Sequence, residues 1–151
     1  MDFPSTQNNF LSPHVEQLVR SFKLLSGQDL IEVIDAQALF FADFALLSHG
    51  TETNPIFNYG NLKALELFEM TWEELTALPS RLSAELGNQA QRELLLREVS
   101  QKGYIQGYSG IRISKSGQRF KMKDATIWNV SDTNGLVIGQ AAMFAQWTRL
   151  P

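Results

Sequence analysis

The 151-residue sequence contains no cysteine. That absence excludes disulfide bonds, thiolate zinc sites, cysteine nucleophiles and any adduct between a cysteine and a cofactor. Histidine is scarce as well, with His14 and His49 alone, and these two do not have the spacing of metal ligands. Acidic residues do not form the clusters that hard cations need. The sequence therefore predicts no metal site.

An excess of positive charge is also lacking, since 13 basic residues face 16 acidic ones and the net charge is −3. Domains dedicated to nucleic acid usually carry net positive charge, so we expect no nucleic-acid partner. The longest apolar stretch, residues 38–47, is interrupted by Asp43 and is far shorter than the ~20 residues of a membrane span. The first residues do not resemble a secretory signal. These features predict a soluble, cytoplasmic, single-domain protein with no membrane partner.

The sequence does have the composition of a globular domain, with 44% hydrophobic residues and 10 Phe, 3 Trp and 3 Tyr. Residues 1–11 are polar and are expected to form a loose tail. Apolar residues at helical spacing then predict one helix from Ser12-Pro13 to Gly27 and favour a second from Leu30 to Phe41, which includes Val33 and Ile34.

The rest of the chain alternates between short strands and helices. Asn61 and Thr71 are expected to cap two short helices, the second of which ends at Pro79. The predicted strands cover residues 44–48, 56–59, 104–114, 119–130 and 136–147, and a longer helix covers residues 89–102. Strands and helices that occur in separate runs are typical of an α+β fold, here with a five-stranded antiparallel sheet.

A series of short motifs in this order resembles one known family. The motifs are Ser48-His49-Gly50, Asn58-Tyr59-Gly60-Asn61, Ala64-Leu65, Leu67-Phe68-Glu69, Pro79-Ser80-Arg81, Ser83-Ala84-Glu85, Tyr108-Ser109-Gly110, Arg112, Ser114, Gly117, Arg119-Phe120, Trp128-Asn129 and Gly139-Gln140-Ala141-Ala142. Together they are similar to the MEKHLA domain family, which is related to PAS domains. Members occur as stand-alone bacterial proteins and at the C-termini of plant homeodomain–leucine zipper proteins, and this chain resembles the stand-alone bacterial type.

The resemblance implies a PAS-like sheet with short helices on one face and the N-terminal helices packed nearby. Residues 1–37 would then form a tail and helical cap, and residues 38–151 the PAS-like domain. It also implies a sensory, ligand-binding or protein-interaction role with another signalling protein. No cofactor is identified by it: without cysteine a cysteinyl-flavin adduct cannot form, and the helix at residues 89–102 has no histidine to bind haem.

Alternation along the last strand makes both of its faces apolar. Gln140 shares the predicted cavity face with Ile138, Ala142 and Phe144. The opposite, outer face would carry the apolar set Ile127, Val137, Ala141, Met143 and Trp147. Soluble proteins seldom expose such a patch, so we expect either a homodimer or an intramolecular cap over the outer face.

In the strand at residues 119–130, strict alternation turns Asp124 inward beside Phe120, Met122 and Trp128. A buried carboxylate needs a partner, for which Arg112 is the candidate. A β-bulge would instead turn Asp124 outward. The sequence leaves both alternatives open.

Five residues are predicted to contact a small apolar or heteroaromatic ligand in a pocket between sheet and helices. They are Tyr59, Arg81, Arg112, Trp128 and Gln140. Gln140 has the alternative of bonding to neighbouring protein groups, and Arg81 that of clamping its own loop.

No catalytic residue is predicted. Ser48, His49 and Asp43 suggest a Ser–His–Asp set, but a nucleophile elbow and an oxyanion hole are missing from the sequence. Two alternatives remain besides the sensory reading: a small enzyme with Asp124 or His49 as general base, and a dimerisation module with no ligand.

Overall fold

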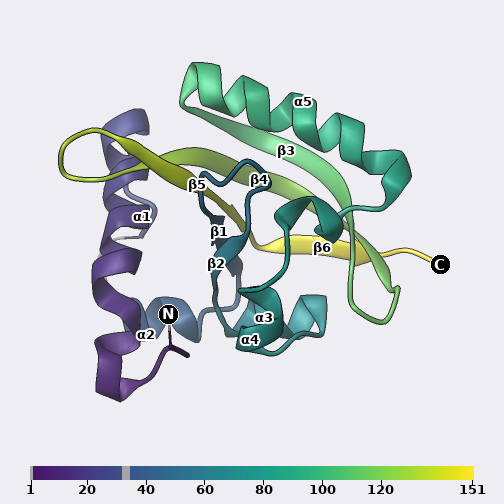
Figure 1. Cartoon of the computed structure of the whole chain (residues 1–151), viewed down its shortest axis with the longest axis horizontal. Helices are drawn as coiled ribbons and strands as arrows, with labels where there is room; N and C mark the ends of the chain where they lie inside the picture. The colour runs from purple at the N-terminus through teal and green to yellow at the C-terminus, as the bar shows by residue number, and fades with distance from the viewer. Residues whose placement is uncertain (1, 32–34) are drawn as a thin grey trace.

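The computed structural model describes residues 2–31 and 35–151 (Figure 1). Val33 and Ile34, which the sequence places in a second helix, lie outside the described residues. The helices are η1 (Thr6–Leu11), α1 (Ser12–Ser26), α2 (Ala36–Phe40), α3 (Leu62–Phe68), α4 (Trp72–Leu75), η2 (Ser80–Ser83) and α5 (Leu86–Lys102), where η marks a 3-10 helix. The strands are β1 (Ala45–His49), β2 (Phe57–Gly60), β3 (Tyr104–Ile113), β4 (Arg119–Ser131), β5 (Val137–Phe144) and β6 (Gln146–Arg149).

The strands form one antiparallel sheet in the order β2-β1-β5-β4-β3, which confirms the predicted five-stranded architecture. The predicted last strand is divided at Ala145 into β5 and β6, and β6 continues along the first half of β4. The two central strands, β5 and β4, are therefore paired on both sides over part of their length. Consecutive residues are buried in both strands, residues 139–141 in β5 and residues 128–130 in β4, so both faces of the sheet are covered there.

A bulge in β4 decides which side chains reach which face. Asp124 has a left-handed backbone conformation, with φ 52°, and its side chain is exposed. Asp tolerates this region better than most residues because its short side chain can satisfy nearby backbone groups. The bulge reverses the alternation, so that Met122 and Ile127 both line the cavity face. Of the two alternatives for Asp124, the structure has the bulge, and Arg112 makes no ion pair with it.

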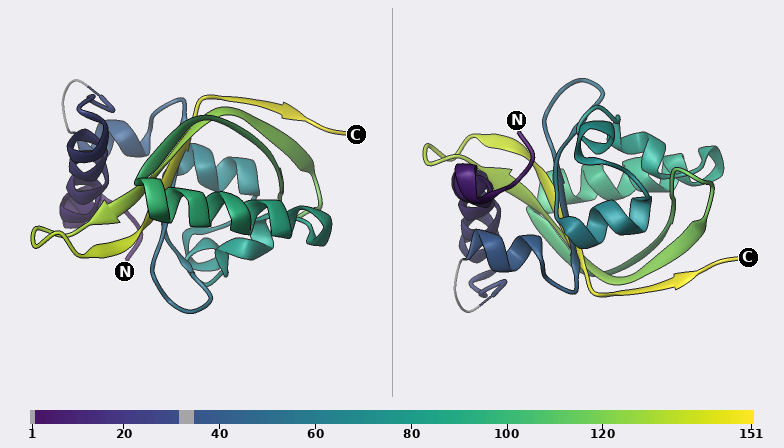
Figure 2. Two further views of the ribbon diagram at one scale, coloured as in Figure 1. Left: turned by 90° about the horizontal axis from the view of Figure 1, so that it is seen from above. Right: turned by 90° about the horizontal axis from the view of Figure 1, so that it is seen from below.

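Helix α1 covers the outer face of the sheet. Its Leu18 carbonyl accepts a hydrogen bond from Trp128 Nε1 at 2.9 Å, and its Phe22 ring packs edge-on against the Trp128 indole. Figure 2 shows α1 beside the sheet on the side opposite α5. Helix α1 thus covers, from within the chain, the part of the outer face around Trp128. One predicted member of the outer-face patch, Ile127, lies on the other face because of the bulge, and Val137 is 45% exposed.

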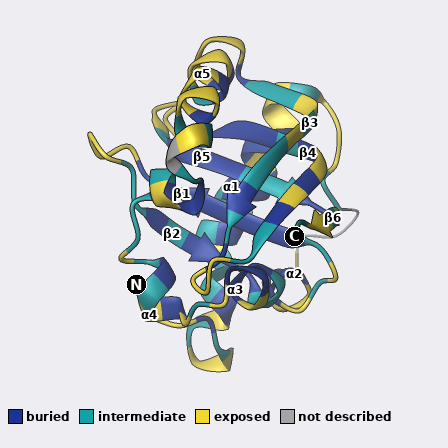
Figure 3. Ribbon diagram, turned by 90° about the vertical axis from the view of Figure 1, so that its right-hand side faces the viewer, coloured by how far each residue is buried: buried dark blue, intermediate teal, exposed yellow. Residues whose placement is uncertain are grey.

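The N-terminal residues are part of this packing, so the prediction of a loose tail is wrong. Phe10 is buried, and Phe3 packs edge-on against Phe40 and Trp72. Apolar side chains within a polar stretch allow it to dock on the domain, and Phe10 belongs to the main hydrophobic core. The buried residues of the molecule lie mainly along the sheet and on the helix faces that pack against it (Figure 3). None of the helices in residues 2–31 and 35–151 has the length and apolar character that a membrane span requires.

Candidate functional site: a cavity with two buried arginines

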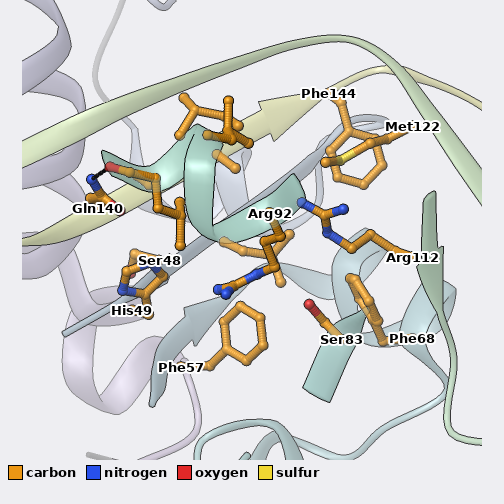
Figure 4. Close-up of a pocket in the computed structure, with 16 residues that line it drawn as sticks. Ser48, His49, Phe57, Phe68, Ser83, Arg92, Arg112, Met122, Gln140 and Phe144 are labelled. Carbon is orange, nitrogen blue, oxygen red and sulfur yellow. Dashed lines mark hydrogen bonds between the residues drawn. The ribbon is translucent and has the colours of Figure 1, made fainter. Parts of the chain in front are cut away.

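A cavity of about 60 Å³ lies between the inner face of the sheet and the segment η2–α5 (Figure 4). Neighbouring strands contribute side chains from one face: His49 of β1 pairs with Gln140 of β5, and Arg112 of β3 pairs with Phe120 of β4. Most of the wall is apolar. The apolar side chains include Leu47, Phe57, Phe68, Leu95, Leu96, Met122, Ile127 and Phe144.

Two arginines enter this apolar wall from opposite sides. Arg92 comes from α5 and is 6% exposed, and Arg112 comes from β3 and is 7% exposed. Burial, together with the positive charge of Arg112, lowers the pKa of Arg92 to about 10, and Glu93 and Tyr108 oppose this shift. Burial likewise lowers the pKa of Arg112, which the neighbouring Tyr108 side chain opposes. We treat both groups as charged, because the arginine guanidinium keeps its proton in proteins.

The hydrogen bonds of the two guanidinium groups go to uncharged acceptors. Arg92 donates to the Ser80 hydroxyl, and Arg112 donates to the Ile111 carbonyl at 2.9 Å. The Cζ atom of Arg112 also lies over the Tyr108 ring, 5.9 Å from the ring centre. No carboxylate in the described part of the chain forms an ion pair with either arginine. Arg92 was not predicted as a site residue. An arginine in a helix is usually exposed, and the sequence around it carries no signal of burial.

His49 adds a neutral polar group to the cavity wall. Its Nδ1 lies 2.9 Å from the Gly50 carbonyl, an acceptor, so Nδ1 carries the hydrogen and Nε2 is left with a free lone pair. Nε2 is buried and has no hydrogen-bond partner among the described residues. Asp124, the other candidate general base, is exposed on the bulge. The structure does not bring the two candidate bases together.

Gln140 lies on the cavity face, as predicted, and its amide is held by protein. Its Nε2 is 3.0 Å from Asn129 Oδ1, 3.1 Å from the Ser100 hydroxyl and 3.2 Å from the Leu96 carbonyl. Asn129 in turn donates to the Val99 carbonyl at 3.2 Å. The two amides therefore attach the C-terminal half of α5 to the sheet, and of the two roles predicted for Gln140 the contacts favour the structural one.

Replacing Gln140 by leucine should lower the free energy of unfolding by about 1–3 kcal/mol, because Asn129 Oδ1 loses a buried donor. Urea unfolding of Gln140→Leu, Asn129→Leu and the double variant would measure the coupling. We expect the double variant to lose less than the sum of the two single losses. Unchanged stability together with weaker ligand binding would instead make Gln140 a ligand contact.

Three of the predicted ligand residues lie outside the cavity. Trp128 faces α1 because of the bulge, which corrects its assignment to the inner face. Tyr59 pairs with Ser48 on the outer face, and the centre of its ring lies 5.8 Å from the centre of the His14 ring. Arg81 is at the surface and donates to Asn54 Oδ1 at 3.1 Å, which is the loop clamp rather than the cavity contact. Of the five predicted ligand residues, the cavity brings together Arg112 and Gln140.

Ser48 and His49 are neighbours in β1, so their side chains point to opposite faces of the sheet. The Ser48 hydroxyl donates to Asn58 Oδ1, and its oxygen is 3.0 Å from Nε2 of His14 in α1. The sequence did not reveal this contact, because residues 14 and 48 are joined only by the fold. Ser48 therefore fixes α1 to β1, and the suggested Ser–His–Asp arrangement does not form.

The two histidines predict how stability depends on pH. Burial lowers the pKa of both His14 and His49 below 6.5. Below pH 6.5 the unfolded chain binds these protons before the folded protein does. The free energy of unfolding should therefore decrease as the pH is lowered from 6.5 toward the lower pKa values of the folded state. Urea unfolding between pH 7.5 and 5.5 would measure this, with a double variant His14→Gln, His49→Gln as control. A wild-type profile as flat as that of the double variant would contradict the prediction.

The fold defined by these elements is that of PAS domains. A PAS domain from Colwellia psychrerythraea has a TM-score of 0.63 and 14% identity, covering 76% of this chain and 92% of its own. The light-state dimer of the fungal blue-light photoreceptor Vivid has a TM-score of 0.64 and 14% identity, covering 87% and 93%. At this level of identity the similarity shows the fold alone.

The family is narrower than the fold class. The MEKHLA domain model matches residues 12–149, and the chain belongs to the MEKHLA domain family. Homeobox-leucine zipper protein ATHB-9 of Arabidopsis thaliana is 28% identical over 134 residues, covering 80% of this chain and 16% of that protein. ATHB-14 of the same plant is 27% identical over 147 residues, covering 89% and 17%. The chain thus spans about a sixth of these relatives, which are plant proteins and give no support to the expected bacterial type.

Proposed function

We propose that this domain is a non-catalytic sensor that binds a small molecule in the cavity between the sheet and α5 and signals through another protein chain. The observation that carries the proposal is the cavity itself, an apolar space into which Arg92, Arg112 and His49 project polar groups. Ligand pockets typically combine an apolar wall with a few placed polar groups. The PAS-like fold and the MEKHLA family support a sensory role.

The position of the cavity suggests how occupancy is transmitted. One wall is the central strand β5, whose Ala141 and Ala142 border the cavity, and the other is α5. On its outer face the sheet carries α1, through Trp128 and Ser48. A ligand that moves α5 or shifts the packing of β5 would therefore change a helix surface that a partner can contact. A partner protein that binds this surface would receive the signal.

Mass spectrometry under native conditions and absorbance of the purified protein would test for a bound small molecule. We expect an additional mass in the wild type and its loss in Ala142→Leu, which fills the cavity from β5. Ala38→Leu, on the exposed surface of α2, is the matched control. A wild type without bound mass, which no small molecule stabilises against heating, would contradict the proposal and favour a module that contacts protein alone.

A further inference from the structure

We propose that the ligand is a small organic acid, whose carboxylate binds between Arg92 and Arg112. The inference rests on the proposed function, because it assigns a chemical class to the occupant of the same cavity. Both guanidinium groups belong to the lining of this single space, one from α5 and one from β3 (Figure 4). They are the charged side chains of that lining.

The charge balance of the cavity is the first argument. Buried charges in proteins are paired, because moving an ion out of water is costly unless a counter-charge replaces the water. Here two positive charges share one apolar space, and each is more than nine-tenths buried. The Tyr108 ring lies over Arg112, and the described residues that line the cavity include no acidic side chain. A single carboxylate between the two arginines would neutralise one of these two positive charges and would be shared by both guanidinium groups.

The hydrogen-bonding capacity of the two arginines also favours a carboxylate. Each guanidinium has five N–H donors in a planar array. Arg92 donates to the Ser80 hydroxyl, and Arg112 donates to the Ile111 carbonyl and to the Tyr108 side chain. The donors that remain match the two oxygens of a carboxylate, which arginine binds in a bidentate geometry.

The size and wall of the cavity restrict the acid. A volume of about 60 Å³ holds roughly four to six water-sized probes at the ~10–15 Å³ that each requires. Apart from the arginines, the space is bordered mainly by Leu47, Phe57 and Ile127 and other apolar side chains. This favours a monocarboxylate with a short hydrocarbon body over a dicarboxylate or a phosphate ester, whose second charge would meet the apolar wall.

A route for the anion also follows from the lining. Arg92, His49 and Gln140 border both the cavity and an open groove on the surface, so they lie between the two. The groove carries Arg81 and Arg97 as well as Glu93. The net positive charge of its arginines attracts an anion toward the side chain of Arg92.

Thermal unfolding of the full chain would test the proposal with a series of sodium carboxylates from acetate to hexanoate. Each acid is paired with its uncharged amide and with sodium chloride at equal ionic strength. We expect the best acid to raise Tm by about 3–6 °C at ten times its Kd, and its amide to have little effect. The response should vanish in Arg112→Met and persist in part in Arg112→Lys. It should be unchanged in Arg20→Gln, on the exposed surface of α1.

The outcomes separate this inference from the proposed function. Equal stabilisation by an acid and its amide would overturn the carboxylate site and leave a ligand-binding cavity in place. No response to any compound, together with no bound mass, would overturn both. Loss of the response in Arg97→Gln but not in Arg112→Met would place the anion in the surface groove and also overturn the inference. If Arg112→Met does not fold, Arg92→Gln provides the same comparison.

Discussion

Replacing Trp128 by alanine is expected to lower the free energy of unfolding by about 3–5 kcal/mol, as for other large buried aromatic residues. Trp128 is fully buried, and its indole joins the sheet to α1 through the bond to the Leu18 carbonyl and the contact with Phe22. Truncation leaves a cavity between these layers and removes the bond from the sheet to the Leu18 carbonyl, which still accepts within α1. Urea unfolding would measure the loss, and amide hydrogen exchange should show α1 opening before the sheet.

Two control variants separate packing from a role in ligand binding. Trp147→Ala, at a partly buried position in β6, should cost less. Trp128→Phe keeps most of the packing and should retain any response to a cavity ligand, because Trp128 is on the outer face. A Trp128→Phe protein that folds normally but has lost ligand binding would show that the indole acts on the cavity after all.

Replacing Asn61 by alanine should have a comparable effect, a loss of at least about 3 kcal/mol. Asn61 is fully buried, and its Oδ1 accepts from the backbone N–H groups of Leu46 at 3.0 Å and Ala64 at 3.1 Å. Its Nδ2 donates to the carbonyls of Leu39 at 3.0 Å and Phe44 at 2.8 Å. Each buried group left without a partner costs about 1–3 kcal/mol.

Thr71 provides the matched comparison, because it caps α4 through the same kind of bond but is exposed to solvent. Thr71→Ala should cost about 1 kcal/mol, the usual value for a helix cap. A loss in Asn61→Ala no larger than that in Thr71→Ala, measured by urea unfolding, would mean that Asn61 acts as a helix cap and contributes nothing more. The structure makes it the point where α2, β1 and α3 are joined.

The role of Asn61 shows how far local reasoning extends. The cap of α3 was predictable, because it involves Asn61 and the residue three positions later. The bonds to Leu39, Phe44 and Leu46 span 15 to 22 residues, and no local pattern signals them. The same limit applies to His14, whose partner Ser48 is 34 residues away.

The order of elements, the α+β class and the PAS-like family were determined by the sequence itself. Periodicity and capping residues act within a few positions, and the motifs from Ser48 to Ala142 identify the family. The apolar alternation of β5 also predicted correctly that both faces of the sheet are covered. These features are local or repetitive, so they can be read without knowledge of which segments meet.

The tertiary structure alone decided which side chains reach the cavity. One left-handed residue, Asp124, reverses the alternation of β4, which moves Ile127 to the cavity and Trp128 to the outer face. Alternation is a local rule, and a single extra residue changes its phase for the rest of the strand. Arg92 enters the cavity because the η2–α5 segment packs on the sheet opposite Arg112. The two arginines line the same cavity because segments far apart in the chain contact each other. A pattern along the sequence does not show which segments do so.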